Sequence, residues 1–203
     1  MGRLKHYLIL CFFVVVTLLY GCSSNEEKKA SYFEKGNAYF EKGEYKSAKL
    51  EFKNAIHIDP EYIEAYIKLG QTYLNLGNPQ EAFRAYSMVA KLDPENLNAK
   101  LKLSTFYLLG KKLKASREKV NAVLSKEPEN IEVLFVLAGI LKLEKKQYEA
   151  VSVFEKIIRL NNKEPRAYIE ISRILARQGK LSEAENILKK AVQLNPDALS
   201  PHF

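Results

Sequence analysis

The chain has 203 residues, of which 47% are hydrophobic and 28% are charged. This balance is typical of a folded chain of one or two domains and excludes a disordered segment. A net charge of +8, from 32 basic and 24 acidic residues, is common in helical proteins with mixed-charge surfaces and is weak evidence for nucleic-acid binding. Both cysteines, Cys11 and Cys22, lie near the N-terminus, which excludes a disulfide framework or a cysteine metal site in the body of the chain.

The N-terminal segment has the pattern of a secretory signal peptide. Arg3 and Lys5 precede an uncharged run over residues 7–21, which is short for a membrane-spanning helix. A basic start, a short apolar run and a small residue at its end predict a signal peptide over residues 1–21. The alternative is a short membrane anchor that is never cleaved.

The boundary of this segment, Leu19-Tyr20-Gly21-Cys22, resembles the lipobox of bacterial lipoproteins. The resemblance implies that Cys22 is acylated, with palmitate among its acyl chains, and becomes the first residue of the mature protein. Residues 22–29 are then the lipid anchor and a solvated tether. The expected location is the bacterial cell envelope, with Ser23 favouring the periplasmic face of the outer membrane.

The rest of the chain has a period of 34 residues. Pro60, Pro94, Pro128 and Pro196 are 34, 34 and 68 residues apart, and Asn162 takes the missing place. The period predicts five repeats followed by a tail over residues 199–203. The repeats are 29–62, 63–96, 97–130, 131–164 and 165–198.

Each repeat has the pattern of two helices. Repeat positions 4, 7, 8 and 11 form one helical face, and positions 20, 24 and 27 form another. Small residues at positions 8 and 20 allow the two helices to approach closely, while turn residues such as Gly43 and Gly77 separate them. The proline ends the second helix. Position 8 is small throughout: Gly36, Gly70, Ser104, Ala138 and Ser172.

These residues resemble tetratricopeptide repeats (TPR). The signature places hold Tyr32, Gly36, Tyr39, Ala48, Phe52, Ala55 and Pro60 in the first repeat, and Tyr66, Leu69, Gly70, Tyr73, Ala82, Tyr86 and Pro94 in the second. The third repeat departs most, with Lys100, Ser104 and Ser116 at signature places. The resemblance implies an all-α, right-handed α-solenoid of five helix-turn-helix repeats.

Catalytic and cofactor motifs are missing from the sequence. There is no glycine-rich phosphate loop, no HExxH and no CxxC. Maturation at Cys22 leaves two histidines, His57 and His202, which we interpret as solvated. We therefore expect a protein that is not an enzyme, has no cofactor or metal, and binds no nucleic acid.

The resemblance places ligand contacts on the first helices of the repeats. An apolar row beside amide and hydroxyl side chains suits an extended peptide, because the amides bond its backbone while its side chains enter apolar pockets. The alternative is that position 5 packs against the neighbouring repeat. The family's carboxylate clamp is excluded, because Phe33 stands where its lysine should be. The predicted groove residues are Phe33, Asn37, Phe40, Ile67, Gln71, Leu74, Leu101, Thr105, Leu108, Phe135, Lys142, Ile169, Arg173 and Arg177.

Charge differs between the two ends of this groove. Lys142, Arg166, Arg173 and Arg177 fall on groove positions of the last two repeats, where like charges should repel one another. One interpretation is that an acidic or carboxylate end of the ligand docks there. The other is that these cations are merely solvated.

The main hypothesis is a membrane-anchored adaptor or scaffold for protein partners in envelope assembly. The assembly would be a pilus, secretion or exopolysaccharide machinery, and similar repeat lipoproteins accompany pilus assembly and exosortase-linked exopolysaccharide systems. One alternative is a binder of anionic glycan or lipid head groups, and a weaker one is a scaffolding subunit of a catalytic partner. The first alternative depends on a lysine ridge at the turns of the last three repeats: Lys111, Lys112, Lys114, Lys145, Lys146 and Lys180.

The last predicted helix, Leu181–Leu194, carries apolar side chains that no later helix of this sequence covers. Terminal repeats normally need a polar cap. We expect this edge to be covered by self-association, by a partner, or by a folded-back tail that uses Leu199 and Phe203.

Overall fold

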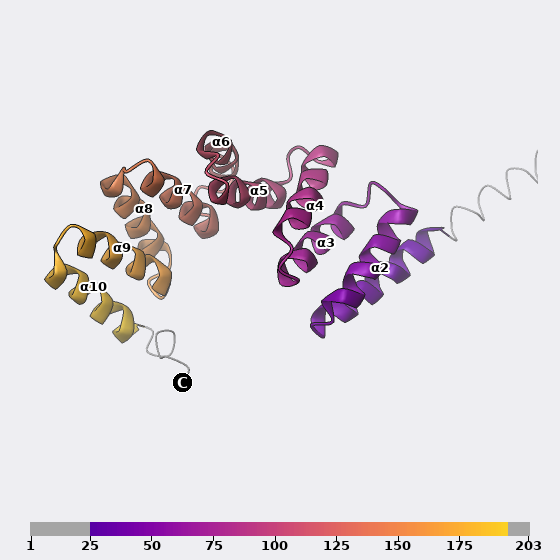
Figure 1. The fold of residues 1–203 in the computed structure, drawn as a ribbon, viewed down its shortest axis with the longest axis horizontal. Coiled ribbons are helices and arrows are strands. Elements are labelled where there is room, and N and C mark those ends of the chain that lie inside the picture. The colour runs from indigo at the N-terminus through magenta and orange to yellow at the C-terminus, as the bar shows by residue number, and fades with distance from the viewer. Residues whose placement is uncertain (1–24, 195–203) are drawn as a thin grey trace, which may run out of the picture. The chain divides into compact units, whose positions relative to one another are not determined.

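The computed structural model describes residues 25–194, which are α-helices joined by short turns and contain no strand (Figure 1). The chain divides between Ala99 and Lys100 into two compact units, each described separately. A first helix covers residues 25–41. The others are α2 (Tyr45–Ile58), α3 (Ile63–Asn75), α4 (Pro79–Leu92), α5 (Leu97–Leu109), α6 (Leu113–Leu124), α7 (Ile131–Leu143), α8 (Gln147–Leu160), α9 (Pro165–Arg177) and α10 (Leu181–Leu194). The predicted all-α helix pairs are confirmed.

Within each unit, helices that follow one another in the chain also pack together. In the first unit α2 packs on α3 and α3 on α4. In the second, α6 packs on α7, α7 on α8, α8 on α9, and α9 on α10. This is the packing of a repeat array, in which no helix pair buries its apolar face alone.

Small residues at position 8 set the distance between the two helices of a repeat, as predicted. A Cβ added at Gly36 would lie 2.6 Å from the Phe52 ring, and one at Gly70 would lie 2.8 Å from the Tyr86 ring. Both rings are fully buried. In the third repeat the buried Ser116 hydroxyl donates a hydrogen bond of 2.7 Å to the carbonyl of Ser104. Departure from the signature there is therefore compensated by a hydrogen bond.

The turn between the paired helices has the same form in all five repeats. The residue at position 16 donates its N–H to the carbonyl five residues earlier, at 2.8–3.0 Å, which closes a Schellman motif. Position 15 is left-handed, with φ of 75° at Gly43, 70° at Gly77 and 79° at Gly179. Lysine takes this place in the third and fourth repeats, at Lys111 (φ 56°) and Lys145 (φ 62°). Glycine favours this conformation, whereas lysine is strained in it.

The first helix differs from the prediction at its start. Residues 25–29, expected as part of the tether, are already helical. Lys29 forms ion pairs with Glu26 at 2.7 Å and with Asp59 at 2.9 Å, and its ammonium lies 5.0 Å from the centroid of the Tyr62 ring. These contacts attach the first turns to the end of α2.

The outer face of the first helix is polar. Ser31, Lys35 and Ala38 are exposed there, while residues at the same repeat positions in α3 are buried. These positions, 3 and 10 in particular, bury Ala65 and Thr72 in α3 and were not recognised as core positions from the sequence. Positions 3, 7 and 10 are thus exposed in the first helix and buried in α3.

The last described helix has the predicted bounds. Ala184 and Ala191 of α10 are buried, whereas Leu188 is 38% and Val192 is 47% exposed. Leu199 and Phe203, expected to fold back over this edge, lie outside the described residues. Among residues 25–194, none of the helices combines the length and apolar character needed to cross a membrane.

Candidate peptide-binding site

A pocket of about 370 Å³ lies on the second unit, where α7 and α9 lie over α8. Its apolar part comes from Phe135 and Gly139 of α7, Phe154 of α8 and Ile169 of α9. Four charged residues form the rest of the lining: Lys142, Arg166, Glu170 and Arg173. Phe135, Lys142, Ile169 and Arg173 are predicted groove residues, and the structure brings these four together.

The apolar part of the pocket is built by packing between helices. The rings of Phe135 and Phe154 are 6.0 Å apart at their centroids, and Phe154 is almost fully buried. Gly139 has no side chain, and Leu108 of α5 fills the space beside it. A Cβ there would lie 2.7 Å from Cδ2 of Leu108. Leu108, a predicted groove residue, therefore packs against α7.

The cations beside the pocket are paired with carboxylates. Glu170 accepts a hydrogen bond from Lys142 and one of 2.7 Å from Arg173. Glu170 therefore lies between Lys142 and Arg173 and offsets the expected repulsion between them. Two positive charges share one negative charge, so a positive excess remains beside the apolar lining.

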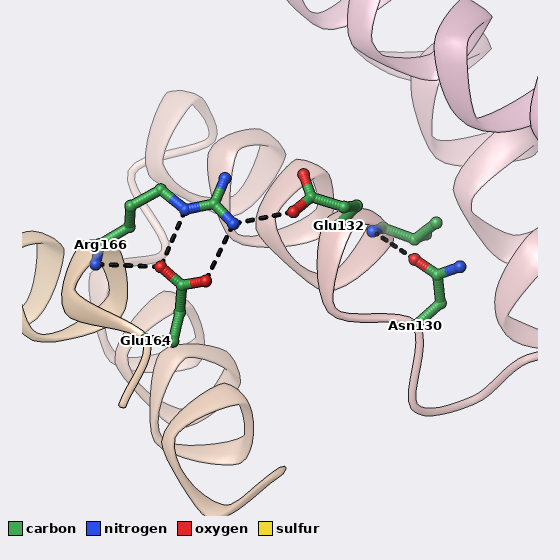
Figure 2. A network of polar contacts seen from close by, with 5 residues as sticks. Asn130, Glu132, Glu164 and Arg166 are labelled. Carbon is green, nitrogen blue, oxygen red and sulfur yellow. Dashed lines mark hydrogen bonds and ion pairs between the residues drawn. The ribbon is translucent and has the colours of Figure 1, made fainter. Parts of the chain in front are cut away.

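Arg166 is held from two sides (Figure 2). Its guanidinium donates to Glu132 at 2.8 Å and to both oxygens of Glu164 at 2.9 and 3.0 Å. Glu164 also accepts the backbone N–H of Arg166 at 3.2 Å and so caps α9. In the same view Asn130 caps α7 by accepting the N–H of Val133 at 3.1 Å.

The pKa values of these groups follow from their contacts. Hydrogen bonds from Arg166 hold the pKa of the Glu164 carboxyl below its ordinary value. Burial would raise the pKa of Glu170, but the hydrogen bonds and charges of Lys142 and Arg173 outweigh it and the net pKa is lowered. Both carboxylates are thus charged at neutral pH and keep their cations in place.

The two predicted aromatic residues of the first helix, Phe33 at position 5 and Phe40 at position 12, are used for packing. Phe33 packs on rings of its own repeat, not of the neighbouring repeat that the alternative named. The ring of Phe33 lies 5.7 Å from that of Phe52 and 5.0 Å from that of Tyr62. Phe40 is covered by Tyr45 at 5.4 Å and by the Lys68 ammonium at 5.2 Å. These two aromatic rings therefore pack against their neighbours and are half-buried.

The other predicted residues of the first unit lie on the first helix and α3. Asn37 has a buried Oδ1 that accepts no hydrogen bond from the residues described. Ile67 and Gln71 are half-buried, and Leu74 is exposed.

Of the remaining predicted residues, Leu101 is half-buried and Thr105 exposed on α5, where the Thr105 hydroxyl donates to the Leu101 carbonyl at 3.3 Å. Arg177, at the end of α9, is exposed and has no ion pair within residues 25–194.

The predicted lipidation site, Cys22, lies outside the described residues. Residues 25–194 contain no cluster of histidine, cysteine and acidic side chains able to hold a metal ion.

Sequence comparisons identify the repeats. A TPR repeat model matches residues 36–77, and two tetratricopeptide repeat models match residues 63–96 and 143–201. The chain carries tetratricopeptide repeats. A comparison with curated proteins found no match.

Solved structures share the TPR fold. A crystal structure of MamA is 22% identical, with a TM-score of 0.68, and the match covers 80% of this chain and 95% of that one. MamA 41-end from Desulfovibrio magneticus RS-1 is 18% identical, with a TM-score of 0.75, covering 85% and 98%. PilF of Pseudomonas aeruginosa is 22% identical, with a TM-score of 0.69, covering 85% and 78%. Likeness at this identity shows the all-α solenoid fold and nothing of the ligand.

The acidic partners of the pocket's cations were not predicted from the sequence. Glu132 and Arg166 are 34 residues apart and hold the same position in neighbouring repeats. Opposite charges one repeat apart are a signal that could have predicted their contact. Glu170 is 28 residues from Lys142, at a different repeat position, so only their contact in the tertiary structure identifies it.

Proposed function

We propose that this TPR protein is a non-enzymatic scaffold that binds an extended peptide segment of a protein partner in the α7–α9 pocket. The observation that carries the proposal is the pocket itself. An apolar lining of Phe135, Phe154 and Ile169 adjoins cations that Glu170 neutralises only in part. Pockets that bind ligands combine a largely apolar surface with a few placed polar groups.

The ligand we propose has an apolar side chain followed by an acidic or carboxylate end. The apolar side chain would lie against Phe135 and Ile169. The carboxylate would compete with Glu170 for Arg173, which can bind a carboxylate with two parallel hydrogen bonds. Arg177, which is exposed and unpaired in the described chain, adds a second cation near the end of α9.

We further propose that the scaffold is anchored in the bacterial cell envelope through an acyl group on Cys22, at the periplasmic face of the outer membrane. The support is the sequence of residues 1–22, with its basic start, its short apolar run and its lipobox-like end. A pilus, secretion or exopolysaccharide assembly is the setting we propose. Self-association through α10 is part of the proposal, supported by exposed Leu188 and Val192.

A peptide-display selection against the immobilised full chain tests the pocket. We expect selected peptides to combine an apolar residue with an acidic end. Titration of a selected peptide should show binding that Ile169→Gln weakens by about tenfold or more, since a buried apolar contact is lost. Leu50→Gln, which changes a 57% exposed leucine of α2, is the matched control and should bind normally. Equal binding by both variants would refute the pocket as the site.

A further inference from the structure

The turns of the second unit expose leucine and tyrosine beside lysine. Leu109 is 74% exposed, Leu143 is 48%, Tyr148 is 83% and Leu181 is 68%. All four lie within three residues of the turns that carry the predicted lysine ridge. We name as the turn edge the residues 109–114, 143–148 and 180–181.

The three turns lie at one edge of the second unit. Arg117, early in α6, donates a hydrogen bond of 2.8 Å to Glu144 in the α7–α8 turn. Gln178, in the α9–α10 turn, donates one of 3.2 Å to Gln147 at the start of α8. These two bonds join each turn to the next, so the lysines and exposed apolar residues share one surface.

Most of the lysines on this edge lack an acidic partner. Lys111, Lys112, Lys114 and Lys145 are exposed and form no ion pair within residues 25–194. Lys146 and Lys180 are half-exposed. Lys146 forms ion pairs with Glu149 at 3.7 Å and with Glu144 at 3.8 Å, and Lys180 forms one with Glu183 at 3.4 Å. The edge therefore keeps a strong positive charge in solution.

The first two repeats show that these residues are not required by the fold. Position 16 is Glu44 and Asn78 there, but Lys112, Lys146 and Lys180 in the last three repeats. Position 13 is Glu41 and Asn75 there, but Leu109 and Leu143 in the third and fourth. The same turn geometry is thus built with polar residues in the first two repeats.

We propose that the turn edge docks on the surface of an anionic phospholipid bilayer, with the lysines at the head groups and the exposed leucines and Tyr148 in the interface. Lysines alone would suit any polyanion. Leucine and tyrosine between them are the combination that interfacial membrane segments use. A soluble acidic polysaccharide offers no apolar phase for the leucines. The docking does not rest on the peptide pocket or on acylation of Cys22.

Tryptophan fluorescence tests this docking directly, because the chain contains no tryptophan. The full-length Leu143→Trp variant is reconstituted into liposomes of phosphatidylcholine with or without phosphatidylglycerol, both containing brominated lipid as a quencher. We expect quenching and a blue shift of emission only with the anionic lipid. Leu50→Trp, on α2 of the first unit, is the control reporter. Its quenching should be the same with and without phosphatidylglycerol.

Two sets of changes separate charge from insertion. The first set copies the turn of the second repeat: Lys111→Gly, Lys112→Asn, Lys145→Gly and Lys146→Asn. Each lysine removed should lower the ratio of membrane-docked to undocked protein by about fivefold. About 1 M salt, where the Debye length is about 3 Å, should do the same. In the lysine-intact chain, Leu109→Asn should weaken the quenching of Leu143→Trp.

Three outcomes would overturn the proposal. One is quenching of Leu143→Trp that is the same with and without phosphatidylglycerol. Another is quenching that survives removal of the four lysines. The third is a soluble acidic polysaccharide that binds the wild type and the Leu109→Asn, Leu143→Asn variant equally, while liposomes leave the reporter unchanged. The last result would assign the edge to a polyanion instead.

Discussion

The guanidinium of Arg166 lies 4.2 Å from the centroid of the Phe135 ring, in the preceding repeat, while Glu132 and Glu164 bind its nitrogens. The contact joins α7 to α9 beside the pocket. The guanidinium is attracted to the face of the aromatic ring, and its N–H groups are bound by the two glutamates. The side chains of Arg166 and Phe135 are therefore held in one position. Two neighbouring repeats are thus fixed together where the candidate ligand would bind.

Loss of this contact should lower stability measurably. We expect Arg166→Gln to reduce the free energy of unfolding by about 1 kcal/mol, a value limited by the exposure of the arginine. Arg84→Gln removes an exposed pair with Glu81 on one helix and should stay within about 0.5 kcal/mol of the wild type. Urea denaturation measures both. A larger loss for Arg84→Gln would contradict the assignment.

Acid should weaken the α7–α9 contacts. The carboxyls of Glu164 and Glu170 have native pKa values below their ordinary 4.5. Their contribution to stability is therefore present above pH 4.5 and is lost as the pH falls through the lowered native values. Denaturation at a series of pH values should show this slope, and Glu164→Gln together with Glu170→Gln should flatten it. An unchanged slope would place the titrating groups elsewhere.

Glycine should stabilise the two turns that carry lysine in the left-handed conformation. We expect Lys111→Gly and Lys145→Gly each to raise the free energy of unfolding by about 0.5–1 kcal/mol, because glycine adopts positive φ without strain. Gly77→Lys is the reverse change, at a φ of 70° with nothing within 4 Å of the added Cβ. It should destabilise by a similar amount. Thermal and urea unfolding compare the three variants.

Charge reversal on α9 should abolish capture of a peptide with an acidic end. In Arg173→Glu with Arg177→Glu, two carboxylates replace the cations and one of them faces Glu170. Both arginines are exposed, so helical content and melting temperature should change little. Circular dichroism checks the fold, and titration of the peptide checks binding. Normal binding by the folded double variant would move the site away from α9.

The proposed anchor is tested at Cys22. We expect Cys22→Ser to yield an unlipidated precursor, since serine cannot form the thioether that carries the lipid. Metabolic labelling with a fatty acid and membrane fractionation in a bacterial host measure the result. A wild-type protein that carries no acyl label and remains in the aqueous fraction would refute the anchor.

The sequence by itself determined the repeat, the helix pairs and the turns. Gly36 and Gly70 predicted close helix contacts, and Gly43 and Gly77 predicted the turns, because a missing side chain and freedom at positive φ are properties of the residue itself. Prolines marked helix ends for a similar reason. The α-helical fold follows from such local preferences repeated every 34 residues.

Only the tertiary structure decided which predicted groove residues stay available to a ligand. Leu108 packs over Gly139, and Phe33 packs between Phe52 and Tyr62, although their repeat positions are those of ligand contacts. Glu170 pairs with Lys142 from 28 residues away. Such contacts depend on the lengths and directions of side chains from different helices, which the position of a residue within its own repeat does not specify.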